Sequence, residues 1–125
     1  MSAAAATLSR EDLLRKAALV RLAIFDVDGV LTDGCLYLGH DGNEFKAFHI
    51  RDGHGLKMLM AAGIEVAVIS GRHAASVERR LDDLGIRLAY LGVQDKRVAL
   101  RDLQARLGLS AEQMAYTGDD LIDLP

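Results

Sequence analysis

The sequence predicts an α/β fold: a Rossmann-like parallel sheet with helices on both faces. Short apolar runs alternate with segments of helical character along most of the 125 residues, which is the pattern of parallel strands joined by helical crossovers. Glycines follow three of the helical segments, where a left-handed residue often ends a helix. Half of the residues are hydrophobic but only 5% are aromatic, so we expect one largely aliphatic core.

The first elements are a short helix and a buried strand. Ser9 followed three positions later by Asp12 is a capping pattern, and the segment EDLLRKAAL has helical spacing. The apolar run RLAIFDV then predicts a strand buried on both faces. We therefore expect residues 1–20 to be an N-terminal extension with a short helix, and residues 21–125 to form one domain.

The next segment breaks this alternation. Residues 35–50 hold two alternating runs on either side of Asp41-Gly42, a pair that favours a tight hairpin turn. The segment therefore predicts a β-hairpin that protrudes after the first strand. Beyond it, the alternation of elements resumes. We expect helices over 53–63, 73–85 and 95–108, strands over 64–70 and 86–92, and a last short strand ending near Tyr116, after a cap at Ser110.

Polar side chains follow three of the predicted strands. Asp26 and Asp28 follow the first strand, Ser70 ends the second, and Asp119 and Asp120 follow the last. Because ligands of parallel α/β sheets bind beyond the carboxyl ends of the strands, we expect these residues to meet at one edge.

Two acidic clusters at one point repel each other unless a cation lies between them. Carboxylates, waters and phosphate oxygens are the ligands that Mg²⁺ prefers, so the pattern indicates Mg²⁺ and a phosphorylated substrate. Lys96 at a helix start, the Ser70 hydroxyl and the amides around Gly29 and Gly71 could bind the phosphate.

Four motifs carry a resemblance to a known superfamily. FDVDGVLTD, VISGR, Lys96 and GDDLID occur in the order and spacing of the haloacid dehalogenase-like (HAD) phosphotransferases. Together with the hairpin and the segments KAFHIRDGHGLKML, LGI and YTGDDLIDLP, they resemble the capless subfamily of 3-deoxy-D-manno-octulosonate 8-phosphate phosphatases. The resemblance covers about residues 22–125 and implies a HAD-like fold without a cap domain.

The resemblance implies a mechanism as well as a fold. It implies a Mg²⁺-dependent phosphatase that cleaves this ester to free sugar acid and phosphate during lipopolysaccharide biosynthesis. Asp26 would attack phosphorus to form an aspartyl-phosphate, and Asp28 would be the general acid and base. Ser70 and Lys96 would bind the phosphoryl oxygens. The cation would be held by Asp26, by the backbone carbonyl of Asp28 and by Asp119, with Asp120 and Asp123 in support.

Substrate and partner contacts follow from the same resemblance. Arg72 could bind the sugar carboxylate bidentately, and Gly71, Arg51 and His54 are further substrate-binding candidates. In such relatives the hairpin builds a tetramer, so we expect a homo-oligomer formed through residues 35–50. Such relatives also continue with a further strand and helix, which the domain over residues 21–125 is expected to lack.

Other interpretations stay open. The substrate could be a nine-carbon sugar acid 9-phosphate, or the chain could be a phospho-acceptor or an assembly domain without phosphatase turnover. Asp26 and Asp28 could form a solvated turn, Lys96 could be a surface residue, and Arg97 could take its place. Asp33 is expected to be a loop residue, and the four histidines lack the spacing of zinc ligands.

Charge and cysteine content narrow the class of protein. A formal charge of −3 argues against a nucleic-acid binder. The single cysteine, Cys35, allows no internal disulfide, which suits a reducing cytoplasm, and we expect it to be packed and inert. We find neither a signal-peptide pattern nor an apolar stretch near the ~20 residues of a membrane span. The sequence therefore predicts a cytoplasmic protein without membrane or nucleic-acid partners.

Overall fold

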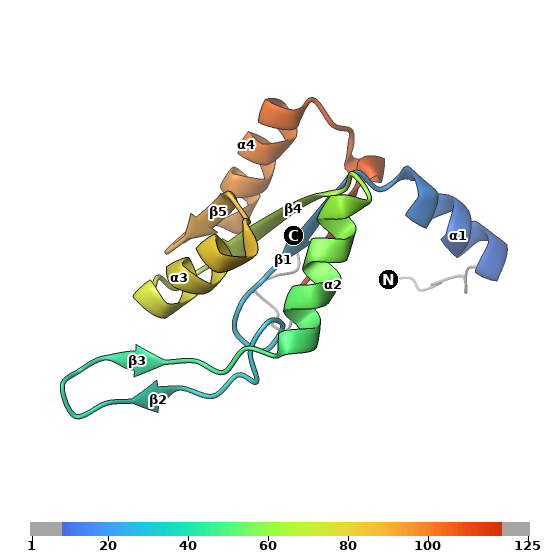
Figure 1. The fold of residues 1–125 in the computed structure, drawn as a ribbon. Coiled ribbons are helices and arrows are strands. Elements are labelled where there is room, and N and C mark those ends of the chain that lie inside the picture. Colours follow the sequence, from blue (N-terminus) through green and yellow to red (C-terminus); the bar gives the residue numbers. More distant parts are fainter. Residues whose placement is uncertain (1–8, 119–125) are drawn as a thin grey trace.

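Four parallel strands form the central sheet of the computed structural model, which describes residues 9–118. Their order across the sheet is β5-β4-β1-β6, so that β1 lies between β4 and β6 (Figure 1). In the register, Ile24 of β1 is paired with Ala67 on one side and with Tyr116 on the other. The predicted parallel sheet is confirmed, with these bounds: β1 Leu22–Phe25, β4 Glu65–Ser70, β5 Leu88–Leu91 and β6 Met114–Thr117.

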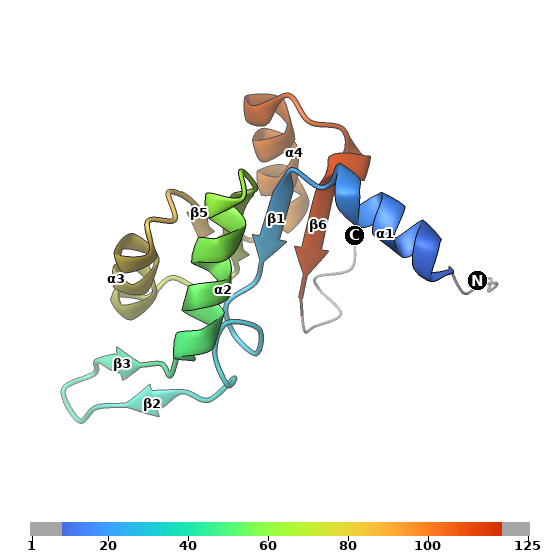
Figure 2. The same cartoon turned by 45° about the vertical axis from the view of Figure 1, so that its right-hand side comes forward.

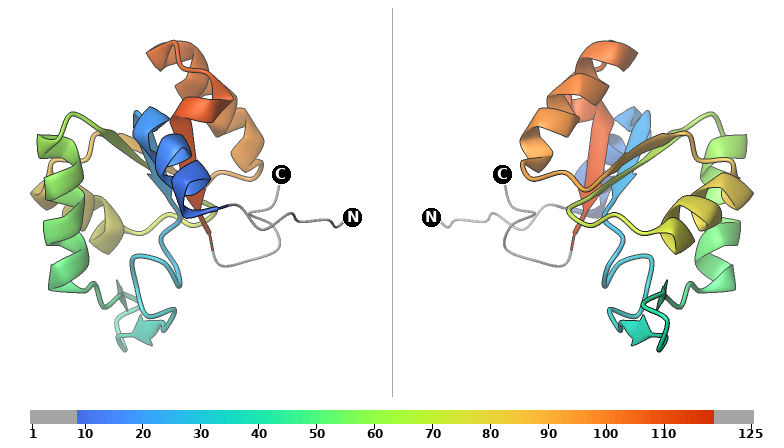
Figure 3. Two further views of the ribbon diagram at one scale, coloured as in Figure 1. Left: turned by 90° about the vertical axis from the view of Figure 1, so that its right-hand side faces the viewer. Right: turned by 90° about the vertical axis from the view of Figure 1, so that its left-hand side faces the viewer.

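Helices cover both faces of this sheet, as predicted. Helices α2 (Ile50–Ala61) and α3 (Ala75–Leu84) lie on one face, and α4 (Lys96–Leu107) lies on the other (Figure 3). The predicted glycine ends are confirmed, and Gly85 and Gly108 adopt the left-handed conformation that glycine reaches without strain.

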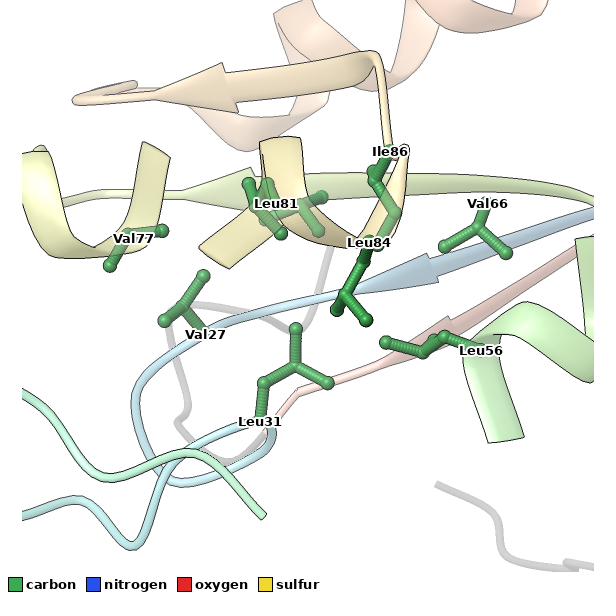
Figure 4. Packing of buried hydrophobic residues seen from close by; sticks show 9 residues of the cluster. Val27, Leu31, Leu56, Val66, Val77, Leu81, Leu84 and Ile86 are labelled. Carbon is green, nitrogen blue, oxygen red and sulfur yellow. The ribbon is translucent and has the colours of Figure 1, made fainter. Parts of the chain in front are cut away.

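Side chains alternate across the sheet and divide the core into two clusters. On β4, Val66 and Val68 face α2 and α3, whereas Ala67 and Ile69 face α4. The first cluster includes Leu56 of α2 and Leu81 and Leu84 of α3, which Figure 4 shows among their buried neighbours. Aliphatic side chains make up the buried part of both clusters, as the low aromatic content predicts.

Helix α2 begins earlier than the sequence predicts. The expected start was residue 53, but the helix begins at Ile50 because His49 caps it: the His49 Nδ1 atom accepts a hydrogen bond from the Arg51 amide. Histidine is not among the residues usually preferred at this position, so the pattern gave no signal. The longer helix places Arg51 in its first turn.

A two-stranded hairpin protrudes from the sheet after β1 (Figure 2). Its strands, β2 (Tyr37–Leu38) and β3 (Glu44–Phe45), are antiparallel, as predicted. The turn is wider than a two-residue turn, because the Gly39 amide donates to the Asn43 carbonyl at 2.8 Å and three residues lie between them. Gly42 adopts a φ of 87°, as the last residue of such loops commonly does. The expectation that Cys35 is packed was wrong: it is exposed at the start of the hairpin.

The N-terminal helix α1 (Arg10–Leu19) stands beside the short 3₁₀ helix η1 (Ala111–Gln113) that precedes β6. Ser9 caps α1 as predicted, since its hydroxyl accepts from the Asp12 amide at 3.1 Å. None of the α1 residues is buried. Among residues 9–118, the structure has no helix with the length and apolar character needed to cross a bilayer.

Candidate active site

Asp26 lies at the carboxyl end of β1, in the middle of the sheet edge. Its backbone amide donates to the Thr117 carbonyl at 3.0 Å, which ties the end of β1 to the end of β6. The side chain is only 9% exposed, and its Oδ1 atom accepts a hydrogen bond from the Val27 amide at 2.7 Å. A buried carboxylate needs compensating partners to remain charged, so this position is built to hold an anion.

Lys96 supplies a positive charge to that carboxylate. Its Nζ atom lies 3.3 Å from Asp26 Oδ2, with the lysine side chain 12% exposed. The same ammonium donates to the Tyr116 hydroxyl at 3.4 Å. The sequence predicted Lys96 at a helix start, and it is the first residue of α4. The two residues are separated widely in sequence, so the β5–α4 connection brings them together.

Asp95 caps α4 and fixes the start of the helix. Its Oδ1 atom accepts from the Arg97 amide at 3.0 Å, and the Arg97 guanidinium also contacts its carboxylate. Hydrogen bonds from the Arg97 side chain hold the pKa of Asp95 below its usual value. Arg97, considered above as a substitute for Lys96, is therefore paired outside the site, and its side chain is 61% exposed.

Asp28 is paired with a lysine that sequence reasoning did not identify. Its Oδ1 atom lies 2.6 Å from the Nζ atom of Lys46, which comes from the second leg of the hairpin. Asp28 is 34% exposed, whereas the Lys46 side chain is 2% exposed. A lysine this buried is rare without a partner. Lys46 lies outside the four motifs, although it is the first residue of the segment KAFHIRDGHGLKML that contributes to the resemblance. That segment and the inward position in an alternating strand are the signals that could have drawn attention to it.

The loop after β4 carries the next group of predicted residues. Ser70 is 2% exposed, and its hydroxyl accepts from the Arg72 amide at 3.3 Å. Its carbonyl accepts from the Val93 amide at 3.0 Å, which joins this loop to the one after β5. Gly71 and Arg72 are exposed beside it, and the Arg72 Nη2 atom lies 3.4 Å from Glu44 Oε1 of the hairpin.

Arg51 and His54 lie together at the start of α2, and no hydrogen bond or ion pair joins either of them to the acids within residues 9–118. Both are exposed in the first turns of α2. The hydrogen bonds and ion pairs of residues 9–118 do not connect either side chain to Asp26 or Lys96. Asp33, as expected, is a loop residue, and it accepts from the Cys35 amide and the Tyr37 hydroxyl.

Three of the predicted acids, Asp119, Asp120 and Asp123, lie outside the described residues. Within residues 9–118, no three acidic, histidine or cysteine side chains are grouped as a metal site would require. Of the predicted metal ligands, Asp26 and Asp28 are the two that lie within the described residues. The last described residue, Gly118, follows Thr117, whose carbonyl is bonded to the Asp26 amide.

No protein-family model matches the sequence. The chain is 50% identical over 115 residues to 3-deoxy-D-manno-octulosonate 8-phosphate phosphatase KdsC of Yersinia pestis. A crystal structure of the phosphatase of that name from the same organism matches with a TM-score of 0.90. The match covers 92% of this chain and 62% of the solved one.

A second solved relative was crystallised with ligands. The phosphatase of this name from Moraxella catarrhalis, in complex with a magnesium ion, a phosphate ion and a KDO molecule, is 42% identical with a TM-score of 0.89. The match covers 93% of this chain and 67% of that structure. The chain spans about three fifths of the length of the curated relatives that it matches.

Proposed function

Because the chain belongs to the family of 3-deoxy-D-manno-octulosonate 8-phosphate phosphatases, within the HAD superfamily, we propose that it hydrolyses the phosphate ester of that eight-carbon sugar acid. The observation that carries the proposal is the buried Asp26 carboxylate, held at the carboxyl edge of the sheet 3.3 Å from the Lys96 ammonium. The products would be the free sugar acid and inorganic phosphate, formed in lipopolysaccharide biosynthesis.

In the first half-reaction a carboxylate oxygen of Asp26 attacks phosphorus. The bond from phosphorus to the sugar oxygen breaks, an aspartyl-phosphate forms, and Asp28 donates a proton to the departing oxygen. The Asp26 side chain suits this role because the Val27 amide fixes one of its oxygens. In the second half-reaction Asp28 takes a proton from water, whose oxygen attacks phosphorus and releases Asp26.

The transferring phosphoryl group carries negative charge, so the site needs donors for its oxygens. Lys96 offers an ammonium next to the nucleophile, and Ser70 offers a hydroxyl on the neighbouring strand. The exposed backbone of Gly71 adds an amide next to that hydroxyl. Phosphoryl transfer depends chiefly on such positioning and on charge neutralisation.

Mg²⁺ is the cofactor that we propose for this chain. The donor set fits it, because the Asp26 carboxylate and the Asp28 carbonyl are hard oxygen ligands two residues apart. Asp119, outside the described residues, would complete the set, with Asp120 and Asp123 in support. When bound, the ion would neutralise charge between the anionic nucleophile and the phosphate.

Substrate choice would rest on groups around the edge of the site. We propose that Arg72 binds the carboxylate of the sugar acid and that Arg51 and His54 make further contacts with the substrate. Arg72 is exposed, and its contact with Glu44 is long at 3.4 Å. A substrate carboxylate could therefore compete for the guanidinium and bind it bidentately.

We further propose that the chain forms a homotetramer through residues 35–50, in the cytoplasm. Leu36, Tyr37, Leu38 and Phe45 of the hairpin are between 41% and 69% exposed. An isolated hairpin with two-residue strands is marginally stable in water, so a second copy that covers these side chains would stabilise it. The domain over residues 21–125 would be the catalytic unit of that assembly.

The test of the proposed function is phosphate release from 3-deoxy-D-manno-octulosonate 8-phosphate, with and without Mg²⁺. We expect release that chelation abolishes and that added Mg²⁺ restores. The chain is assayed beside a version extended after Pro125 with the C-terminal part of a curated relative. The substrate is identified by comparing kcat/KM for this ester with kcat/KM for nine-carbon sugar acid 9-phosphates. A higher value for the nine-carbon esters would refute the eight-carbon substrate. Absence of Mg²⁺-dependent release from both versions would refute the phosphatase itself.

A further inference from the structure

Lys46 is a buried cation outside the four motifs, and its contact is with Asp28. The residue follows β3 on the returning leg of the hairpin. Its side chain is 2% exposed, yet its Nζ atom lies 2.6 Å from Asp28 Oδ1. Burying an ammonium is costly unless a charged partner compensates it. The Asp28 carboxylate therefore offsets the cost of burying the Lys46 side chain.

The returning leg presents one face to the site and the other to solvent. Counted with their backbone atoms, Glu44, Lys46 and Phe48 are partly buried, whereas Phe45 and Ala47 between them are exposed. This alternation is that of an extended strand, in which every second side chain points the same way. On the inward face, Glu44 contacts Arg72 in the loop after β4. Lys46, on the same face, contacts Asp28 in the loop after β1.

The two contacts differ in how firmly they are held. The Glu44–Arg72 pair is 3.4 Å long and its side chains are 32% and 53% exposed, so solvent screens it and it contributes little. The Lys46–Asp28 pair is short, and the lysine has no comparable exposure to water. A short charge-assisted bond to a buried donor fixes the direction of a carboxylate far better.

We propose that Lys46 is a positioning residue that holds the Asp28 carboxylate in the orientation from which Asp28 exchanges protons during the reaction. The inference rests on the proposed function. Asp28 is one third exposed, in a loop where Gly29 adopts a φ of 78°, so its carboxylate would otherwise turn toward water. Displacing a catalytic group by about 1 Å can cost about 10²-fold in rate. The hairpin thereby becomes part of the catalytic apparatus.

The variants that test this are Lys46→Met, which removes the charge and keeps the length, and Lys46→Arg, which keeps the charge. Lys57→Met is the matched control, because Lys57 is exposed on α2. We expect Lys46→Met to lower kcat for the sugar-acid 8-phosphate by about 10²-fold, the lower end for loss of general acid catalysis. KM should change by less than about threefold, Lys46→Arg should recover part of kcat, and the control should match wild type.

A second substrate separates positioning from phosphate binding. The nitrophenolate leaving group of 4-nitrophenyl phosphate needs no proton, so its burst rate should be preserved in Lys46→Met while later turnover slows. In the Asp28→Asn background, Lys46→Met should cause no further loss, because both changes act on one group. Three results would overturn the proposal. The first is an equal loss of the burst rates with 4-nitrophenyl phosphate and with the sugar-acid ester. The others are a change confined to KM and additive losses in the double variant.

A crystal structure of Lys46→Met gives a readout independent of activity. We expect the Asp28 carboxylate to rotate away from its wild-type position while Asp26 and Lys96 stay in place. An unmoved Asp28 would refute the positioning role, whatever the turnover. If the wild-type chain and its extended version are both inactive and Asp28 is displaced in the variant, the proposed function is refuted and the positioning contact stands.

Discussion

The central sheet and the hairpin obtain their stability in opposite ways. Strand β1 is flanked by β4 and β6, and Leu22 and Ile24 within it are at most 1% exposed. The strands of the hairpin are two residues long, and Tyr37 and Leu38 are 49% and 69% exposed. The sheet is stabilised by the apolar side chains that it buries, whereas the hairpin depends on its contacts with the loops after β1 and β4. The candidate site lies between the two, with Asp26, the proposed nucleophile, at the edge of the sheet and Lys46 on the hairpin.

The largest effect is expected at the sheet. Asp26→Asn should lower kcat by about 10⁴-fold or more, as removal of a nucleophile does elsewhere, because an amide cannot form the phosphoenzyme. Phosphate release from the sugar-acid ester measures it, with circular dichroism to verify the fold. Asp82→Asn, an exposed change on α3, should retain wild-type turnover. Appreciable turnover by Asp26→Asn would assign the nucleophile elsewhere.

The second prediction compares the two regions by stability. Leu103 is fully buried against the α4 face of the sheet, so Leu103→Ala should lower the free energy of unfolding by about 2–5 kcal/mol. Leu38→Ala in the hairpin should change it by about 0.5 kcal/mol or less in the dissociated chain. Urea denaturation at low protein concentration measures both. Equal losses would mean that the hairpin has a core of its own.

The third prediction concerns association through the hairpin. Replacing Leu38 and Phe45 together by serine removes exposed apolar surface that we assign to an interface between copies. We expect light scattering to report a smaller assembly than wild type, with the far-ultraviolet spectrum unchanged. Leu13→Ser and Leu14→Ser on the exposed face of α1 are the matched pair. An unchanged mass in the hairpin variant would exclude this interface.

The smallest effect is expected at the cap of α4. The pKa of Asp95 is lowered, chiefly by the Arg97 side chain, so the carboxylate stabilises the fold above its ordinary pKa of 3.8. That contribution is lost as the pH falls through the lowered value in the folded protein. Asp95→Ala should therefore lower Tm by a few degrees at pH 6, and the difference should shrink below pH 3.8. A difference that grows in acid would contradict this assignment.

The order of elements could be predicted from sequence because its signals are local. Apolar runs mark the strands, and glycines such as Gly85 and Gly108 end the helices where they occur. The motifs assigned Asp26 and Lys96 to one site, and the structure brings their side chains within 3.3 Å, although the ion pair itself was not predicted. In each case a few neighbouring residues carried the information.

The features that the sequence did not predict share a physical cause: each depends on contacts that no short sequence pattern encodes. The Lys46–Asp28 contact joins positions 18 apart and exists only because the hairpin folds back toward the site. The early start of α2 depends on the ring of His49, which acts as an uncommon cap. The hairpin loop is longer than predicted because Gly39 pairs with Asn43, whereas the Asp-Gly pair alone suggested a shorter one.

The position of β1 between β4 and β6 has a consequence for biosynthesis. Strand β6 is the last described element to leave the ribosome, so a nascent chain exposes one side of β1 until Thr117 has emerged. Parallel pairing over such a separation closes slowly, because a long loop must be ordered first. Asp26, whose amide bonds to Thr117, therefore acquires its final backbone setting only after Thr117 has emerged and β6 has paired with β1.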